Sequence, residues 1–300
     1  MTRTVLVLGA SGRFGRHAAE AFARAGWTLR PFDRATDDLM QAAMGAEIIV
    51  NGWNPPYSQW QATVPGLTRQ VIAAARASGA TVMIPGNVYV YGPDMPPVIG
   101  PGVAHRAAHP LGRIRREMEQ AYRAAGVPTI LLRAGDFLDD RASGNWFDRV
   151  LAKSIRKGRL SYPGPLDRPH AWAWLPDLAA AMVGLAEKRA DLPQFAELAF
   201  PGYTLTGEDL AAACAEALQR PVKARRMSWL PIQLARPFWA EARHLLEMRY
   251  LWETPHRMDG SALDVVLPDR PQTPLVSALA RALQHQVDPD QPVTRGPVAV

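Results

Sequence analysis

Short apolar runs and amphipathic stretches alternate along the chain as far as Ala134. The apolar runs fall at residues 4–8, 28–32, 48–50, 81–84 and 129–132. Between them, apolar residues recur at helical spacing over residues 14–25, 38–44, 68–77 and 113–125. Strands that alternate with helices of this length predict βαβ units and a doubly wound parallel sheet. We expect Asp37 to cap the second of these helices.

The pattern changes after Ala134, where many Pro, Trp and Phe residues occur in short irregular segments. Helical spacing returns over residues 177–188, 209–218 and 238–248. We therefore predict an α/β core over residues 1–135 and a smaller mixed lobe over residues 136–287, part of which returns to the core. Residues 288–300 are Pro-rich and show no periodicity, so we expect a loose tail there.

A glycine-rich turn joins the first predicted strand to the first predicted helix. Glycines let the backbone turn tightly and approach a pyrophosphate, whose charge meets free N–H groups at the start of a helix. A glycine motif between a strand and a helix therefore predicts a dinucleotide site. The turn reads GASGRFG, and its candidate contacts are Gly9, Ser11, Gly12, Arg13, Phe14 and Gly15.

The residues after the second predicted strand bear on which dinucleotide binds. Asp33 ends that strand, and a carboxylate there accepts hydrogen bonds from the adenosine ribose hydroxyls, which favours NAD. Arg34 and Arg13 instead favour NADP, because a guanidinium binds a 2′-phosphate bidentately. Two cations beside one carboxylate tilt our expectation toward NADP. Each arginine is alternatively a solvated residue or one stacked on the adenine.

The spacing Gly-x-x-Gly-x-x-Gly resembles that of the extended and atypical short-chain dehydrogenases/reductases, the NAD-dependent epimerase/dehydratase group. Further segments resemble that family in the same order: VNGW at 50–53, GNVYVYG at 86–92, HPLGRIRREME at 109–119, LLRAGDF at 131–137 and HAWAWLPDLA at 170–179. The resemblance implies a Rossmann-type fold with a small C-terminal substrate lobe. It also implies that Asn51, Gly52 and Trp53 lie along the cofactor, and that the family's third strand is shortened or lost.

The same resemblance implies a catalytic site whose residues differ from the family's own. The family uses a Tyr as general acid/base, a Lys that lowers the pKa of this Tyr, and a Ser that orients the substrate. The matching positions carry Leu111, Arg115 and Asn87. Leu111 has no proton to transfer, whereas Arg115 still supplies a charge that can hold the nicotinamide ribose, and Asn87 still makes hydrogen bonds. Tyr89 and His109 are the candidates for the missing proton donor.

Candidate substrate contacts lie near the start of the second half. Asp136 and Phe137 follow a predicted strand at the end where ligands of open α/β sheets bind. His170 and Trp172 belong to an aromatic segment that the resemblance places over the nicotinamide. Alternatively, these aromatic side chains only pack the lobe, with Asp177 as a helix cap.

Composition excludes several other classes. The 300 residues carry a net charge of +6, but no run of five like charges, so we expect no nucleic-acid partner. Cys214 is alone, which excludes an internal disulfide and a Cys-based zinc site. His105 and His109 have a spacing that suits a metal but no evident third ligand, so we expect no metal. No apolar run approaches the length of a membrane-spanning helix, so we expect no membrane span and a cytoplasmic protein.

Together these observations predict an NAD(P)-dependent oxidoreductase or epimerase/dehydratase that acts on a carbonyl or hydroxyl group of a small-molecule substrate. The alternative is a non-catalytic, NAD(P)-responsive regulatory protein, such as occurs among relatives that lack the Tyr–Lys pair. Leu111 favours the alternative, whereas the aromatic lobe favours an enzyme. The resemblance also implies a homodimer built on the helices at 68–77 and 113–125.

Overall fold

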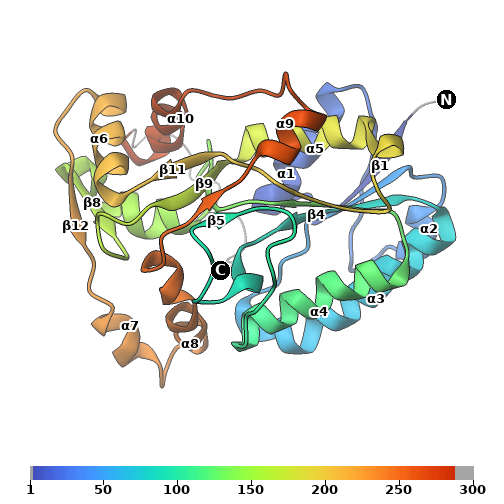
Figure 1. The fold of residues 1–300 in the computed structure, drawn as a ribbon, viewed down its shortest axis with the longest axis horizontal. Coiled ribbons are helices and arrows are strands. Elements are labelled where there is room, and N and C mark those ends of the chain that lie inside the picture. The colour runs from blue at the N-terminus through green and yellow to red at the C-terminus, as the bar shows by residue number, and fades with distance from the viewer. Residues whose placement is uncertain (1–2, 288–300) are drawn as a thin grey trace.

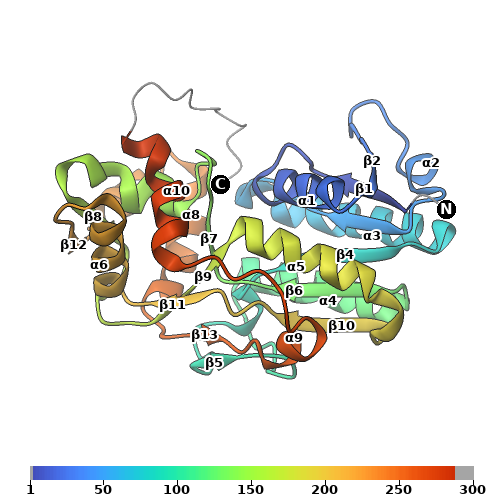
Figure 2. The same ribbon diagram turned by 90° about the horizontal axis from the view of Figure 1, so that it is seen from above.

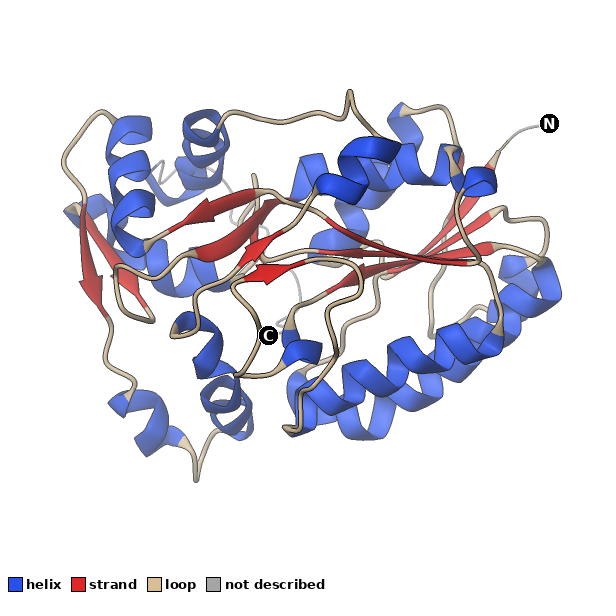
Figure 3. Cartoon of the chain, in the orientation of Figure 1, coloured by secondary structure: helices blue, strands red, loops and turns tan. Residues whose placement is uncertain are grey.

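A parallel six-stranded sheet forms the centre of the protein in a computed structural model, which describes residues 3–287. Its strand order is β10-β6-β4-β3-β1-β2. Figure 1 and Figure 3 show this sheet between layers of helices. The strands are β1 (Thr4–Leu8), β2 (Thr28–Arg30), β3 (Ile48–Asn51), β4 (Thr81–Gly86), β6 (Thr129–Arg133) and β10 (Phe195–Ala199). All neighbours pair in parallel, which confirms the predicted doubly wound α/β fold of the Rossmann type.

Helices cover both faces of this sheet (Figure 1 and Figure 2). One face carries α1 (Arg13–Arg24) and α5 (Leu175–Glu187), and the other carries α3 (Trp60–Ser78) and α4 (Pro110–Ala125). Successive side chains of a strand point to opposite faces. Val5 and Val7 accordingly join the core beneath α1 and α5, whereas Leu6 and Leu8 join the core above α3 and α4. Burial on both faces explains why these strands read as continuous apolar runs.

The strand β2 forms one edge of the sheet, and no strand of the described residues pairs with its outer side. After Arg30 the chain forms only the short helix α2 (Leu39–Ala43) before it enters β3 at Ile48. Among the described residues no strand lies between β2 and β3, in agreement with the expectation of a shortened or lost third strand. The cap of α2 is Asp38, whose carboxylate accepts the N–H of Gln41 at 2.9 Å. The predicted cap, Asp37, instead accepts the N–H of Asp33 at 2.7 Å.

The other core helices match their predictions closely except at the start of α3. That helix begins at Trp60 rather than at residue 68. Trp60, Val64 and Thr68 are all buried and extend the apolar stripe of the helix by two turns. The segment passes through Pro65 inside the helix, and this proline obscured the helical pattern.

The second half of the chain supplies β10 to the central sheet and builds a lobe beside it. The lobe contains the small sheets β11-β9-β7 and β12-β8, and a third small pair, β13-β5, lies next to it. The strands are β5 (Val98–Ile99), β7 (Asp136–Leu138), β8 (Arg159–Tyr162), β9 (His170–Trp174), β11 (Tyr203–Leu205), β12 (Lys223–Arg226) and β13 (Arg257–Met258). The helices are α6 (Gly207–Leu218), α7 (Leu230–Ala235), α8 (Ala240–Glu247), α9 (Ser261–Val266) and α10 (Leu275–Val287).

Several smaller expectations have structural outcomes. Cys214 is buried in the lobe core, and burial raises the pKa of its thiol to about 12. Asp177 does not cap α5, because its carboxylate accepts the N–H and hydroxyl of Thr273 at 2.7 and 2.8 Å. Within residues 3–287, no helix is both long enough and apolar enough to cross a membrane. The predicted tail lies outside the described residues. The homodimer stays a prediction.

Candidate functional site

The glycine turn has the geometry that a close ligand needs. Gly9 has φ +76°, a conformation that favours glycine, and a Cβ there would lie 3.1 Å from the Gly52 carbonyl oxygen. A Cβ on Gly15 would overlap the carbonyl of Gly9, so this glycine packs α1 against the turn. Gly12 is the N-cap of α1 and offers no side-chain cap. The positive end of the helix therefore remains available to an anion.

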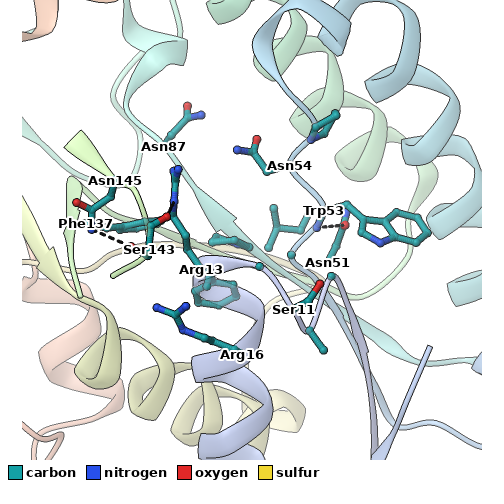
Figure 4. A pocket seen from close by; sticks show the side chains of 18 of the residues that line it. Ser11, Arg13, Arg16, Asn51, Trp53, Asn54, Asn87, Phe137, Ser143 and Asn145 are labelled. Carbon is teal, nitrogen blue, oxygen red and sulfur yellow. Dashed lines mark hydrogen bonds between the residues drawn. The ribbon is translucent and has the colours of Figure 1, made fainter. Parts of the chain in front are cut away.

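One cavity of about 910 Å³ runs along the carboxyl ends of β1, β3, β4 and β6. Figure 4 shows that side chains from α1, from the segment after β3 and from the lobe face this space. Nearly all of the predicted cofactor contacts line it. They are Gly9, Ser11, Gly12, Arg13, Phe14, Asp33, Arg34, Asn51, Gly52, Trp53 and Arg115. Gly15 lies behind the turn that it packs.

At the β2 end of the cavity, two carboxylates and one guanidinium form the lining. Asp33 and Asp37 both line the space, as does Arg34. The guanidinium of Arg34 lies 5.9 Å from the ring centroid of Trp53, and the ring of Phe32 also contacts Trp53. The charged groups here therefore sum to a net negative charge beside an aromatic surface.

Arg13 does not extend toward this end. Its guanidinium donates to the carbonyl oxygens of Ser143 at 2.9 Å and Gly144 at 3.0 Å (Figure 4). Burial lowers the pKa of Arg13. The residue thereby joins the glycine turn to a loop of the lobe. Its predicted role at a 2′-phosphate loses support, since two carbonyl groups far along the chain engage its side chain.

At the β4 end, two phenols face each other. The hydroxyl of Tyr89 lies 2.6 Å from that of Tyr57, and both residues line the cavity. Trp60 packs on both rings. Asn87 also lines the cavity, and its Oδ1 accepts the N–H of Tyr89. Tyr57 was not predicted; its signal in the sequence is an aromatic residue that follows two prolines just after a strand, in NGWNPPY.

Arg115 reaches the same end from α4. It donates to Oδ1 of Asn54 at 2.7 Å, and its guanidinium lies 4.1 Å from the ring centroid of Trp60. Burial lowers the pKa of Arg115. Burial raises the pKa of Tyr57, and it raises that of Tyr89 well above its ordinary value. Both phenols therefore keep their protons at neutral pH.

Two residues of α4 and its cap do not reach the cavity. Leu111, at the position of the family's Tyr, is 1% exposed within the core. His109 caps α4 and lies 2.9 Å from Glu247 and 3.1 Å from the hydroxyl of Tyr250. His109 is absent from the cavity lining. Of the two candidates predicted for the proton donor, Tyr89 lines the cavity and His109 does not.

The four predicted substrate residues divide into two pairs. Asp136 and Phe137 line the cavity. His170 lies behind Asp136, with its Nε2 at 2.7 Å from the carboxylate, and is 2% exposed. Trp172 is 1% exposed in the lobe core. The aromatic segment therefore packs the lobe. His170 and Trp172 do not line the cavity, so the expected direct contact with a substrate is wrong for both.

A buried network of charged side chains contacts the backbone at the β4 end. Arg133, 1% exposed, donates to both carboxylate oxygens of Glu119 and to Glu197 at 2.6 Å. It also donates to the carbonyl oxygen of Asn87. His105 lies 3.4 Å from Glu197 and belongs to this network, whereas His109 pairs with Glu247. The guanidinium of Arg133 already meets the carboxylates that a metal would need.

Solved structures share this fold over nearly the whole chain. An epimerase-type protein from Burkholderia cenocepacia has a TM-score of 0.72 at 17% identity, with 95% of this chain and 98% of that chain covered. MoeE5 in complex with UDP-glucose and NAD has a TM-score of 0.72 at 16% identity, with 95% and 98% covered. RMD from Pseudomonas aeruginosa, complexed with NADPH, has a TM-score of 0.71 at 15% identity, with 95% and 99% covered.

Sequence comparison adds no closer relative, because no protein-family profile and no curated protein matches the chain. Identities as low as those of the three structures establish the fold alone. The resemblance inferred from the motifs is confirmed at that level: the chain has the Rossmann-type fold that these solved structures share.

Proposed function

We propose that the protein is an oxidoreductase that uses NAD(H) and acts on a carbonyl or hydroxyl group of a small molecule. The observation that carries the proposal is one continuous cavity, which joins the glycine turn to the phenol pair of Tyr57 and Tyr89. A dinucleotide laid along the carboxyl ends of the strands spans such a cavity from its pyrophosphate to its reactive ring. Two of the structures named above hold NAD or NADPH, which supports the same cofactor class.

The residues of the cavity fit a nicotinamide dinucleotide. Gly9 and Gly12 keep the turn tight, because a Cβ on either residue would press on backbone carbonyl groups, and the start of α1 offers N–H groups to a pyrophosphate. Trp53 and Asn51 flank the path toward the β4 end. When bound, the nicotinamide supplies or accepts a hydride. Arg115 would hold its ribose.

The β2 end favours NAD(H) over NADP(H). Asp33 and Asp37 oppose one guanidinium, that of Arg34, so a 2′-phosphate would meet net negative charge. A ribose with two free hydroxyls instead donates hydrogen bonds to the carboxylate of Asp33. Our sequence-based preference for NADP counted Arg13 as a second cation, but the carbonyl oxygens of the lobe hold that side chain.

At the β4 end, Tyr89 is assigned the role of polarising the substrate oxygen. It keeps its proton at neutral pH, because burial and the neighbouring charge of Asp136 raise its pKa. A protonated phenol stabilises the negative charge that develops on a carbonyl oxygen during hydride transfer. Asn87 follows β4 directly and orients the same oxygen. The arrangement favours carbonyl reduction.

Leu111 favours a second candidate, a regulatory protein that binds NAD(H) without turnover. Its burial removes the family's proton donor from the cavity. The two candidates differ in one result, because both bind the dinucleotide but only the first reduces a carbonyl substrate. A spectrophotometric screen of aldehydes and ketones with NADH separates them.

The experiment for the cofactor is a fluorescence titration with NADH and with NADPH. We expect tighter binding of NADH, and a loss of about tenfold or more in Asp33→Ala, since a charge-assisted hydrogen bond contributes about 1.5–3 kcal/mol. Arg34→Ala should change NADH affinity little. Asp38→Ala is the matched control, because this carboxylate caps α2 and does not line the cavity. Tighter binding of NADPH would contradict the NAD(H) assignment, and binding of neither would contradict the function.

A further inference from the structure

A carboxyl–imidazole pair borders the cavity at the end where Tyr89 lies. Asp136 lines the cavity, and a quarter of its side chain is exposed. Its Oδ2 lies 2.7 Å from Nε2 of His170, whose side chain is 3% exposed. The two residues belong to neighbouring strands, because Asp136 on β7 pairs with Trp172 on β9, two residues beyond His170. The acid therefore faces the cavity and the imidazole stands behind it.

Hydrogen-bond accounting places a proton between these two groups. Nδ1 of His170 lies 3.3 Å from the carbonyl oxygen of Leu251, which only accepts, and this contact favours a hydrogen on Nδ1. If Nε2 and Asp136 were both deprotonated, two acceptors would face each other at hydrogen-bond distance. One proton therefore lies between them, either on the carboxyl or on the imidazole. Both forms contain the same number of protons.

The groups around His170 allow its imidazole to carry this proton. The indole of Trp252 stacks on the imidazole with ring centroids 4.3 Å apart and planes 1° apart, an arrangement that stabilises a cationic ring. Among the described residues, the other histidine in contact is His256, at 4.6 Å. Burial, together with the charge of His170, lowers the pKa of His256 to about 3. His256 is therefore neutral and adds no second positive charge.

The other titratable groups near Asp136 are phenols that keep their protons. Burial raises the pKa of Tyr57, Tyr89 and Tyr162, and the charge of Asp136 adds to each of these shifts. None of the three supplies a proton readily at neutral pH. The pair of Asp136 and His170 is thus, among the described residues, the remaining acid–base group at this end of the cavity.

We propose that Asp136, backed by His170, is the acid–base residue of the reaction and replaces the Tyr that Leu111 has displaced. The proposal rests on the proposed function. In carbonyl reduction, the substrate carbon gains a hydride from the reduced nicotinamide, and the carbonyl π pair moves to the oxygen. The oxygen takes one proton from the pair through the carboxyl group of Asp136, while Tyr89 donates a hydrogen bond to it. Asp136 is left as a carboxylate beside neutral His170, and a proton from water in the cavity restores the pair.

Asp136→Asn tests this role, because the amide keeps the size of the carboxyl and still donates to Nε2 of neutral His170. We expect kcat/KM to fall about 100-fold or more, the usual range for loss of a general acid. NADH affinity should stay within twofold, and the dependence of kcat/KM on pH should differ from that of the wild type. Turnover within threefold of the wild type, with an unchanged pH profile, would overturn the proposal.

His109→Gln is the control variant. It removes a similar carboxyl–imidazole pair, with Glu247, that lies outside the cavity. We expect kcat/KM within about twofold of the wild type. A loss as large as that of Asp136→Asn would mean that breaking any such pair disturbs the fold, and it would remove the support that Asp136→Asn gives.

A second measurement does not depend on turnover. In ¹⁵N-histidine spectra of the protein without cofactor, the His170 signal is assigned by its absence in His170→Gln. We expect a protonated Nδ1 and, in Asp136→Asn, loss of any second proton from the ring. A bare Nδ1 with a protonated Nε2 would overturn the shared proton. If the wild type binds NADH but reduces no carbonyl, the proposed function and the proposed reaction step are both wrong. The spectra still show whether Asp136 and His170 share a proton.

Discussion

The two ends of the cavity are built in different ways. The β2 end comes from one short stretch of chain, in which the glycine turn, Asp33 and Arg34 lie within a single βαβ unit. The β4 end collects side chains from five separate segments. They are Tyr57, Tyr89, Arg115, Asp136 and His170. One end is encoded by local spacing and the other by long-range packing.

This difference follows from what each end of the cavity has to hold in place. A turn that holds a pyrophosphate needs only glycine geometry and the start of a helix. An end that orients a reacting oxygen also needs neighbours that fix its position, and a buried network around Arg133 does so for the segment at Asn87. Arg133 binds the backbone of Asn87 while it pairs with Glu119 and Glu197. Changes in the network should therefore disturb the β4 end more than the β2 end.

Arg133→Met gives the largest expected effect. Removal of the guanidinium leaves Glu119 and Glu197 buried without their main partner, and such losses cost about 3–5 kcal/mol. Urea unfolding measures the change. In the protein that remains folded, NADH should still bind, because the β2 end keeps all of its contacts. Equal loss of NADH affinity and turnover would contradict the separation of the two ends.

The matched control for that variant is Arg123→Met. Arg123 also contacts Glu197, at 3.3 Å, but its side chain is 56% exposed. Exposed ion pairs contribute about 0–1 kcal/mol. A stability loss as large as that of Arg133→Met would mean that burial does not set the strength of this network.

Gly15→Ala tests the β2 end. The new Cβ would overlap the carbonyl of Gly9, and the turn has to shift. Overpacking of this kind costs about 1–3 kcal/mol, and we expect NADH affinity to fall at least tenfold. Gly66→Ala in α3 is the control, because the nearest atom to its Cβ is the end of the Arg69 side chain at 4.0 Å. NADH affinity that stays unchanged in Gly15→Ala would show that the turn does not hold the dinucleotide.

The same distinction explains what the sequence could predict. The sheet, the glycine turn and the shortened or lost third strand follow from local patterns, and the structure agrees with them. Tyr57 was missed because its position depends on the fold of a Pro-rich loop toward Tyr89. His170 was expected against a substrate, whereas its pairing with Asp136 depends on the register of β7 and β9. Spacing along the chain contains no information on either contact.

The smallest expected effect is a loss of stability in acid that reports the network alone. Burial by itself would raise the pKa of Glu197, but hydrogen bonding to His105 and the charge of Arg133 lower it from 4.5 to about 2. A lowered pKa means that this carboxylate stabilises the fold above pH 4.5 and that the stabilisation is lost as the pH falls toward 2. With allowance for solvent screening of this partly exposed group, we expect about 1–2 kcal/mol. Unfolding curves at pH 6 and pH 3 measure it, and Glu197→Gln should flatten the difference. If Glu197→Gln keeps the full pH dependence, the acid-labile group lies elsewhere, and the network supports the β4 end through packing instead of charge.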